Sequence, residues 1–445
     1  MDAIDWIVNV QKRNRERVFL IDGWSGEEVT YRKLHERGCA LAEFLIKRGL
    51  KKGDRVAIIL NNSIDCAYIY FACLYCGIVT VPINPILTSR EINLIVKSIN
   101  PKLILLSKKT SSLIEHNEQR PYLIVDTNND ITDDEIQSRE ILNINTLQGG
   151  KGFQTFQGVT SDDTMTIVFT SGTTAIPKGV VHTIADLIDN SRLFCWLMGI
   201  GPKNKFYGIL AMTYLGGYFN LLMLPYAAEA SVVITKAFDA TSSLDFWSCA
   251  KKYEVNTLWL VPTIMSILLE MDRSEVGEVF CRDQVKLALV GTAPLPREMK
   301  KRFETRYNIN LYENYGLSET LFISTNPPKV NSQTDSVGKI LIDIDVCVRD
   351  VSGNDLAYGQ EGELFVKSPY TMKGYFKIEE KSIDKVSDQE WFPTGDMGVI
   401  TDNGELYVTG RKKDLIIRGG INISPKVIEE ALYEDPDVVT CAVVG

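Results

Sequence analysis

The fold is decided by residues 164–183, Thr164-Met-Thr-Ile-Val-Phe-Thr-Ser-Gly-Thr-Thr-Ala-Ile-Pro-Lys-Gly-Val-Val-His-Thr183. Residues 165–169 are apolar and rich in β-branched side chains, which predicts a short buried strand. Residues 170–174 then supply four hydroxyl groups and one glycine, and Pro177-Lys178-Gly179 follows. Small residues let backbone N–H groups approach an anion, hydroxyls donate hydrogen bonds, and a lysine adds charge. The stretch therefore predicts a phosphate-binding loop after a strand, although such stretches are also typical of plain turns.

The composition is that of an acidic globular protein with two or three domains. The chain has 445 residues, of which 45% are hydrophobic and 24% charged, and its net charge is −9. This balance argues against a nucleic-acid partner. An anionic substrate would therefore have to be bound by local dipoles and a few well-placed cations.

The cysteines and the amino terminus predict a cytoplasmic protein. Nine cysteines occur without the spacing of a disulfide framework, which is typical of a reduced compartment. Cys73 and Cys76 are expected on a buried helix face rather than in a metal or redox site. The amino terminus lacks a basic start and an apolar core, so we expect no signal peptide. Gly77 and Pro82 interrupt the apolar run 66–83, which favours a buried helix and strand over a membrane span.

Short apolar strands alternate with helical stretches in two parts of the chain, residues 18–125 and 164–320. Thr30 and the box Thr88-Ser-Arg-Glu91 are helix start signals. The strands expected in the second part are 164–170, 206–211, 231–235, 257–261 and 286–290. We therefore predict an α/β fold whose large N-terminal domain contains two mostly parallel sheets. Ligands of such sheets bind beyond the carboxyl ends of the strands.

The remaining segments differ in pattern. Residues 126–163 are polar with little periodicity and are expected to form a surface connection. Residues 337–410 have a β pattern with an Asn403-Gly404 turn, which predicts a small barrel-like subdomain. After residue 411 we expect the start of a small α+β domain, with a helix from Ser424-Pro425 and a strand over 438–444. The expected domains are 1–410, with its site core at 163–330, and 411–445.

Four further stretches carry residue types suited to a nucleotide site. They are Val290-Gly-Thr-Ala-Pro-Leu295, Asn314-Tyr-Gly-Leu-Ser-Glu-Thr320, Trp391-Phe-Pro-Thr-Gly-Asp396 and Gly410-Arg-Lys-Lys-Asp-Leu-Ile-Ile-Arg-Gly-Gly420. Tyr315 offers a face for a base, Ser318 a hydroxyl for a phosphate and Glu319 a ligand for Mg²⁺. Asp396 offers an acceptor for a ribose diol. Taken singly, each stretch is also typical of an ordinary turn or a solvated charge.

In this order and spacing, the five stretches resemble the motifs of the adenylate-forming superfamily. This superfamily contains acyl- and aryl-CoA synthetases, peptide-synthetase adenylation domains and luciferases, and the resemblance covers residues 15–445. It implies a two-step reaction. A carboxylate attacks the α-phosphate of ATP, which gives acyl-AMP and pyrophosphate, and the thiol of CoA then displaces AMP. The resemblance implies ATP, Mg²⁺ and CoA as ligands.

The resemblance also implies roles for individual residues. It assigns the loop that holds the β- and γ-phosphates to Thr170, Ser171, Gly172, Thr173, Thr174 and Lys178. It places adenine and the acid beside Gly291, Thr292, Ala293, Pro294, Asn314, Tyr315 and Gly316. It assigns the α-phosphate to Ser318 or Thr320, the magnesium ion to Glu319, and the ribose to Asp396 and Arg411. It makes Lys413 the hinge of a rotating C-terminal domain and Gly420 part of the CoA tunnel. Of the histidines, His182 follows the loop directly and is expected to be a neighbour of the site.

The chain departs from the superfamily pattern at two positions of the site. Ala175 stands where glycine is common, and its methyl group narrows the backbone angles open to the loop. The acid-pocket stretch Ala211-Met-Thr-Tyr-Leu-Gly-Gly217 has Tyr214 in place of histidine, followed by Gly216 and Gly217. It offers no carboxylate for a substrate ammonium group. This favours a fatty, branched or aryl acid over an amino acid.

The third departure concerns the end of the chain. In the superfamily the C-terminal domain continues for about a hundred residues, a normal domain size, and carries a lysine that contacts the α-phosphate. We expect this chain to be truncated before that lysine, which would slow adenylation by roughly 10²–10³. Two alternatives therefore stay open beside a CoA ligase. One is an adenylation domain that loads a carrier protein, and the other is a non-catalytic binder of ATP or acyl-adenylate.

Overall fold

The structure is a computed structural model that describes residues 1–115, 121–126, 141–150, 152–170, 177–328, 335–377, 382–386, 390–418, 421–435, 438 and 441–444. The chain forms two compact units. The first unit contains Met1–Arg192, Gly201–Ala237 and Met372–Val386. The second contains Leu193–Ile200, Phe238–Thr371 and Ser387–Gly445.

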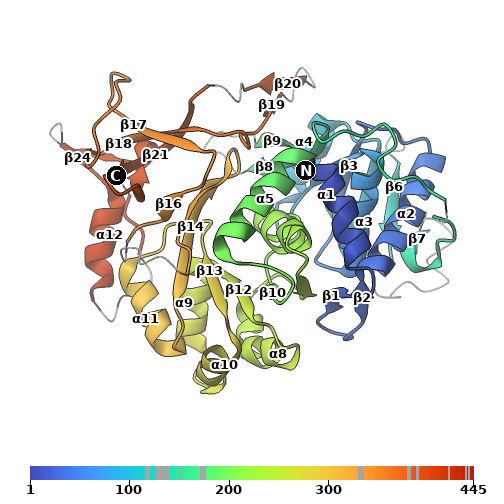
Figure 1. Ribbon diagram of the computed structural model, residues 1–445, viewed down its shortest axis with the longest axis horizontal. Helices are drawn as coiled ribbons and strands as arrows, with labels where there is room; N and C mark the ends of the chain where they lie inside the picture. Colours follow the sequence, from blue (N-terminus) through green and yellow to red (C-terminus); the bar gives the residue numbers. More distant parts are fainter. Residues whose placement is uncertain are drawn as a thin grey trace. The chain divides into compact units, whose positions relative to one another are not determined.

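The first unit is a layered α/β structure with two sheets (Figure 1). Its helices are α1 (Ala3–Arg13), α2 (Tyr31–Lys47), α3 (Ile64–Cys76), α4 (Ser89–Ile99), α6 (Leu215–Tyr218) and α7 (Leu224–Ala227), together with the start of α5 (Ile184–Met198). The strands of its larger sheet are β3 (Arg55–Ile59), β4 (Val79–Pro82), β5 (Leu103–Leu106), β6 (Tyr122–Val125), β7 (Ile141–Leu142), β8 (Thr164–Thr170), β9 (Lys178–Thr183), β19 (Gly374–Lys377) and β20 (Ser382–Lys385). The strands of its smaller sheet are β1 (Val18–Asp22), β2 (Glu28–Thr30), β10 (Lys205–Gly208) and β11 (Ser231–Ile234).

Both sheets of the first unit have several parallel strands and antiparallel strands at one edge. The larger sheet has the order β20-β19-β9-β8-β4-β3-β5-β6-β7. The six strands β8, β4, β3, β5, β6 and β7 are parallel to one another, and β9, β19 and β20 pair in antiparallel fashion. In the smaller sheet β10, β11 and β1 are parallel and β2 is antiparallel to β1. Strands β4 and β5 are buried along their whole length and β3 is buried after Arg55, as expected of strands covered on both faces.

The second unit carries strands of a mixed sheet, and its last two strands form a separate two-stranded sheet. Its helices are α8 (Phe246–Lys252), α9 (Pro262–Met271), α10 (Val276–Gln284), α11 (Arg297–Tyr307) and α12 (Pro425–Tyr433). Its strands are β12 (Thr257–Leu260), β13 (Leu287–Val290), β14 (Leu311–Leu317), β15 (Leu321–Thr325), β16 (Gly338–Ile340), β17 (Asp345–Arg349), β18 (Gly362–Lys367), β21 (Phe392–Ile400), β22 (Glu405–Arg411), β23 (Ile416–Arg418) and β24 (Ile421–Ile423).

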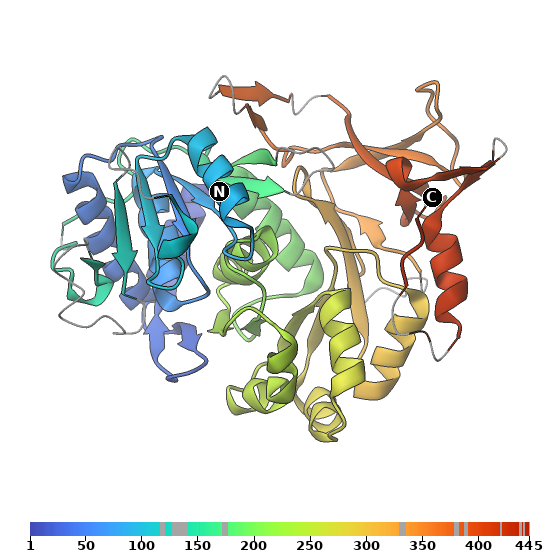
Figure 2. The ribbon, with the colours of Figure 1, turned by 180° about the vertical axis from the view of Figure 1, so that it is seen from behind.

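The sheet of the second unit changes from parallel to antiparallel at the β14–β15 hairpin. Strands β12, β13 and β14 are parallel, and the order then continues β15-β16-β22-β21-β18-β17 with antiparallel pairing. The strands predicted to form a barrel-like subdomain therefore continue this sheet. Helix α12 lies beside α11 in both views (Figures 1 and 2).

Most local signals in the sequence are confirmed. Thr30 caps α2, and Thr88 and Glu91 form the predicted capping box of α4. Strands β8, β10, β11, β12 and β13 match the five predicted in the second part of the chain. The Asn403-Gly404 turn joins β21 to β22, and Gly404 has the positive φ of 78° that this turn requires. Cys73 is buried in α3, and the apolar run 66–83 forms α3 and β4.

Two expectations are wrong. The connection 126–163 contains β7, which pairs with β6 at the edge of the sheet. The strand predicted over 438–444 is absent from the described residues of that stretch. There the N–H of Val443 donates to the carboxylate of Glu429 (2.9 Å) instead of to a neighbouring strand. Both errors concern pairing, which a short apolar run does not specify by itself.

Candidate active site

The predicted phosphate loop connects β8 to β9. The two strands form an antiparallel hairpin whose last paired residues are Thr170 and Lys178. Thr170 is half-buried and Lys178 is exposed. Gly179 lies where a side chain would meet Ile167, Phe169 and Phe376. Ser171, Gly172, Thr173, Thr174 and Ala175, which were assigned to this loop, lie outside the described residues. The hairpin itself was not predicted, because β9 was not recognised as a strand.

A buried polar cluster supports the base of this hairpin. His182 is fully buried in β9, with its Nδ1 3.6 Å from Oδ2 of Asp186. Asp186 also accepts the Thr183 N–H (2.8 Å), and its Oδ1 is 3.7 Å from Nζ of Lys373. Burial alone would raise the pKa of Asp186, but its contacts with His182, the Thr183 N–H and Lys373 outweigh burial and lower it. His182 is thus a structural neighbour of the loop, as expected.

Asn62 and Tyr70, which the sequence did not predict, hold the backbone of the acid-pocket stretch by hydrogen bonds. Asn62 is 6% exposed, donates to Leu210 O (2.9 Å) and Thr235 O (2.9 Å), and accepts from the Met212 N–H (2.7 Å). The Tyr70 hydroxyl donates to Met212 O (2.7 Å). Tyr214, at the end of this loop, is 43% exposed. The signal that could have identified Asn62 is its position three residues after the end of the buried strand β3.

The two glycines after Tyr214 are required by close packing. Gly216 and Gly217 lie in α6, and the Gly217 N–H donates to Tyr214 O (3.0 Å). A side chain on Gly217 would meet the backbone of Ala211. The three predicted acid-pocket residues therefore form one compact turn in the first unit.

In the second unit, the segment after β13 packs on the start of the Asn314–Thr320 motif. Asn314 is 7% exposed, and its Nδ2 donates to Val290 O (2.8 Å). A side chain on Gly291 would meet Asn314 Oδ1. Thr292 has a φ of 70°, which is unusual for a β-branched residue, and it is exposed with Ala293 and Pro294. Strained backbone of this kind is frequent at functional sites.

The turn between β14 and β15 presents the hydroxyl and carboxylate groups of the motif. Gly316 is needed because a side chain there would meet the backbone of Leu321 on the partner strand. Thr320 is fully buried, and its N–H donates to Leu317 O (3.3 Å). Ser318 and Glu319 are half-buried on the turn. Thr320 thus closes the turn, which leaves Ser318 and Glu319 as the groups that can face a ligand.

Tyr315, Asp396 and Arg411 meet in the second unit. The Tyr315 hydroxyl donates to Asp396 Oδ2 (2.6 Å), and Arg411 Nε is 2.7 Å from Asp396 Oδ1. Asp396 is 2% exposed. Burial raises the pKa of Asp396, although Tyr315 and Arg411 both favour its charged form. Burial and the neighbouring carboxylate raise the pKa of Tyr315 well above its usual range. A carboxylate accepts about four hydrogen bonds, so Asp396 keeps acceptor sites for a ligand.

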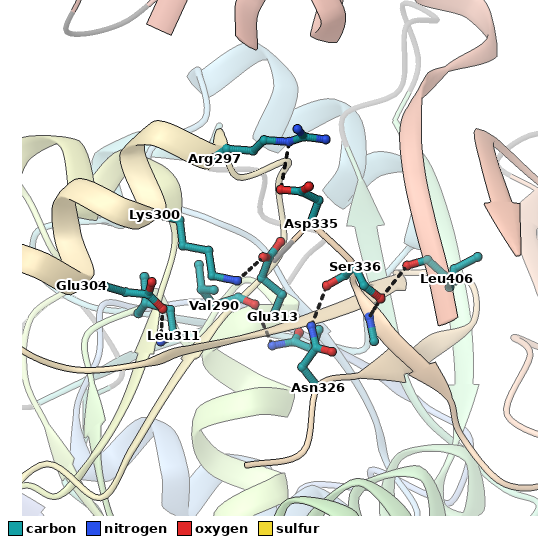
Figure 3. A network of polar contacts seen from close by, with 12 residues as sticks. Val290, Arg297, Lys300, Glu304, Leu311, Glu313, Asn326, Asp335, Ser336 and Leu406 are labelled. Atoms are coloured by element: carbon teal, nitrogen blue, oxygen red, sulfur yellow. Dashed lines mark hydrogen bonds and ion pairs between the residues drawn. The ribbon is translucent and has the colours of Figure 1, made fainter. Parts of the chain in front are cut away.

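A polar network joins β14 to α11 (Figure 3). Lys300 Nζ and Glu313 Oε1 are 2.8 Å apart, and their side chains are 12% and 13% exposed. Arg297 at the start of α11 pairs with Asp335 at 2.8 Å. Burial raises the pKa of Glu313, and Lys300 opposes this shift. The sequence did not predict Lys300 as part of the site because its partner lies on another element.

The predicted hinge follows β22 directly. Lys413 is exposed in the short 3₁₀ helix Lys412–Asp414. Lys412 Nζ is 2.6 Å from Glu363 Oε2 on β18, and the Thr409 hydroxyl donates to Glu361 (2.5 Å). The residues before Lys413 are thus fixed to the sheet. Gly420, the predicted tunnel residue, lies outside the described residues.

The carboxylate of Glu319 is suited to a metal ion that is shared with phosphates. Among the described residues, no group of three or more His, Cys, Asp and Glu side chains could hold a metal by itself. Mg²⁺ is commonly bound by one or two carboxylates together with substrate phosphates and water, and a single glutamate fits that pattern. In the same part of the chain, no helix is long and apolar enough to cross a membrane.

Comparison with known proteins identifies the family. A family model described as AMP-binding enzyme matches residues 8–376. The match covers more than half of the chain, and the chain therefore belongs to this family of AMP-binding enzymes. The expected membership in the adenylate-forming superfamily is thereby confirmed.

Individual relatives agree with this assignment. The 2-succinylbenzoate–CoA ligase of Bacillus velezensis is 29% identical over 99% of this chain and 84% of its own length. The long-chain-fatty-acid–CoA ligase FadD13 of Mycobacterium tuberculosis is 28% identical over 94% of this chain and 80% of its own. The crystal structure of ATP-bound MatB from Rhodopseudomonas palustris superposes with a TM-score of 0.82 at 25% identity, covering 100% of this chain and 86% of that one.

Proposed function

We propose that the protein is an AMP-forming acid–thiol ligase that converts a carboxylic acid, ATP and CoA into an acyl-CoA, AMP and pyrophosphate. The observation that carries this proposal is the buried Asp396 carboxylate, held by Tyr315 and Arg411 in a chain of the AMP-binding enzyme family. The similar proteins from Bacillus velezensis and Mycobacterium tuberculosis are both named as CoA ligases.

Binding of the nucleotide would use the residues of the second unit. The Tyr315 ring offers a face for adenine, and the free acceptor sites of Asp396 suit the two ribose hydroxyls. Ser318 would donate to the α-phosphate. Glu319 would hold a magnesium ion, which neutralises phosphate charge when bound. Lys178 and the hydroxyl loop of the first unit would bind the β- and γ-phosphates.

The chemistry needs positioning and neutralised charge more than covalent help from the protein. A substrate carboxylate oxygen forms a bond to the α-phosphorus, and the bond to the bridging oxygen of the β-phosphate breaks. Pyrophosphate leaves with its negative charge beside Lys178. The CoA sulfur then bonds to the acyl carbon, the bond to AMP breaks, and the thiol proton passes to water. No general base is required for the first step, because the attacking acid is already ionised.

The acid we propose is fatty, branched or aryl and carries no ammonium group. The support is the loop at Met212-Thr213-Tyr214, which presents a half-exposed aromatic hydroxyl and no carboxylate. The Asn62 and Tyr70 hydrogen bonds fix the backbone of this loop. The ring of Tyr214 is therefore expected to limit the size of the acid.

The domain roles and the compartment are also proposals. We propose that residues 1–410 bind the substrates and that residues 411–445 belong to a part of the protein that moves about Lys413. The fixed contacts of Thr409 and Lys412 support a hinge that begins just after them. We propose a cytoplasmic location, supported by nine cysteines that are all free thiols.

A thioester assay over a panel of acids tests this function. The chain is incubated with ATP, magnesium, CoA and one fatty, branched, aryl or amino acid at a time, and acyl-CoA is measured by mass spectrometry. We expect acyl-CoA from at least one acid of the first three kinds. Transfer to a carrier-protein thiol but not to CoA would overturn the CoA assignment. Tight ATP binding without turnover of any acid would indicate a binding protein instead.

A further inference from the structure

We propose that Tyr375 is a positioning residue that holds the ammonium group of Lys178 ready for the phosphates of ATP. This inference rests on the proposed function of the β8–β9 loop. The Lys178 Nζ lies over the face of the Tyr375 ring, 5.0 Å from its centroid, which is within the range of a cation–π interaction.

The strand register brings the two side chains together. Strand β19 is antiparallel to β9, with Tyr375 opposite Val180 and Phe376 opposite Gly179. Lys178 is two residues before Val180, so it shares a face of the sheet with Tyr375 and is its diagonal neighbour. Long and aromatic side chains reach each other across this diagonal.

Contacts of the residues on either side of Tyr375 fix the position of strand β19. The side chain of Phe376, on the opposite face, is 5% exposed and belongs to the core cluster that contains Ile167 and Val181. The Lys373 N–H donates to Val181 O (2.9 Å), and its ammonium is 3.7 Å from Asp186. The ring is therefore positioned by contacts on both sides of Tyr375 along the strand.

An aromatic ring suits this task better than a carboxylate would. A carboxylate within ion-pair distance would neutralise the ammonium and compete with an incoming phosphate for it. The ring attracts the ammonium through its quadrupole and leaves its full charge available. It also restricts the freely rotating lysine side chain, whose ordering otherwise opposes binding. Lys178 can thus exchange the ring for a phosphate without breaking an ion pair.

A double-mutant cycle between Tyr375 and Lys178 tests this role. The variants are Tyr375→Ile, which keeps a residue favoured in strands, Tyr375→Phe, which keeps the ring, Lys178→Ala and the Ile/Ala double variant. Tyr358→Ile is a matched control at a tyrosine that is 71% exposed. KM for ATP and kcat are measured in the thioester assay, and pyrophosphate binding is measured by calorimetry. Thermal melting checks that each variant is folded.

We expect Tyr375→Ile to raise KM for ATP and to weaken pyrophosphate binding by about two- to fivefold, with kcat changed less. Tyr375→Phe should behave as the wild type. In the Lys178→Ala background, Tyr375→Ile should have no further effect on either quantity, because its role depends on the ammonium. If Tyr375→Ile is not folded, Tyr375→Val takes its place in the cycle.

Three results would overturn the inference. The first is that Tyr375→Ile weakens ATP and pyrophosphate binding by the same factor with and without Lys178. The second is that Tyr375→Ile binds both ligands as the wild type does. Equal losses from Tyr375→Phe and Tyr375→Ile would show that the hydroxyl matters and not the ring. If the wild type binds neither ATP nor pyrophosphate, the proposed function falls as well. If the wild type turns over and Tyr375→Ile has no effect, the inference about Tyr375 is wrong and the proposed function stands.

Discussion

At the scale of single residues, the predicted site contains one buried charge that is held by two partners, the carboxylate of Asp396. Asp396 is 2% exposed, and its partners are one hydroxyl and one guanidinium group. Its pKa is raised by burial, and the two partners limit the rise. If Asp396 binds a ribose as proposed, the affinity for that ribose should depend on pH and on Tyr315.

We predict that Tyr315→Phe shifts the pH dependence of ATP binding. Loss of the hydroxyl removes a hydrogen bond that lowers the pKa of Asp396, so that pKa rises further. Ionised Asp396 accepts from the ribose, and KM for ATP in the variant should therefore begin to rise at a higher pH as the solution is acidified. The measurement is KM for ATP against pH.

The neighbouring Tyr312→Phe is the control for this prediction, and identical profiles for the two variants would contradict it. Unfolding in acid is not expected to explain the rise of KM for ATP. Because the folded pKa of Asp396 lies above its usual value, the folded state binds the proton more tightly, and this group favours the fold as pH falls. Thermal melting across the same pH range checks this point.

Thr292 is predicted to lower the stability of the protein. Its φ of 70° costs a β-branched residue about 1–2 kcal/mol. Thr292→Gly should therefore raise the free energy of unfolding in urea by about 1 kcal/mol. This figure allows for the greater conformational entropy of glycine in the unfolded chain, which offsets part of the gain. Thr160→Gly is the control at an exposed threonine without positive φ, and it should destabilise. A loss of stability in both variants would refute the strain at Thr292.

At the scale of elements, the ion pair of Lys300 and Glu313 joins α11 to the strand that carries Asn314 and Tyr315 (Figure 3). The pair is largely buried, and removal of Glu313 takes a close opposite charge away from the ammonium group of Lys300. We predict that Glu313→Ala destabilises the protein by about 3 kcal/mol, measured by denaturant unfolding. The double variant Lys300→Met/Glu313→Leu should recover most of this loss. Equal stability of the single and double variants would contradict the buried-charge explanation.

The elements also show what the sequence predicts well. The caps at Thr30 and Thr88 and the turn at Asn403-Gly404 depend on residues close together in the chain, and the structure confirms all three. Strand β9 was missed, because the antiparallel return after the phosphate loop depends on pairing with β8 and β19. The strand predicted over 438–444 is wrong for a similar reason, since in the described residues of that stretch the N–H groups of Cys441 and Val443 donate to side chains and not to a neighbouring strand.

At the scale of the whole molecule, the first unit is assembled from separated pieces of chain. Met372–Val386 belongs to this unit although most of the residues around it belong to the other. Tyr375 therefore reaches Lys178 through a strand pairing that no local pattern reveals. Motif reasoning could name Asp396, Tyr315 and Lys178, but it could not find partners such as Lys300 and Tyr375. These partners depend on contacts between distant segments.

The central claim is that this chain splits ATP to AMP and pyrophosphate with a carboxylic acid. The most direct test is to identify the products that ATP gives after incubation with the chain. The chain is mixed with ATP, magnesium and the acid panel, with and without CoA, and AMP, ADP, pyrophosphate and phosphate are separated by chromatography. Asp396→Ala serves as the control and should raise KM for ATP by about tenfold or more, through lost hydrogen bonds to a charged group. We predict equal amounts of AMP and pyrophosphate that depend on the acid and increase with CoA. Formation of ADP and phosphate, or AMP release that is independent of every acid, would contradict the account.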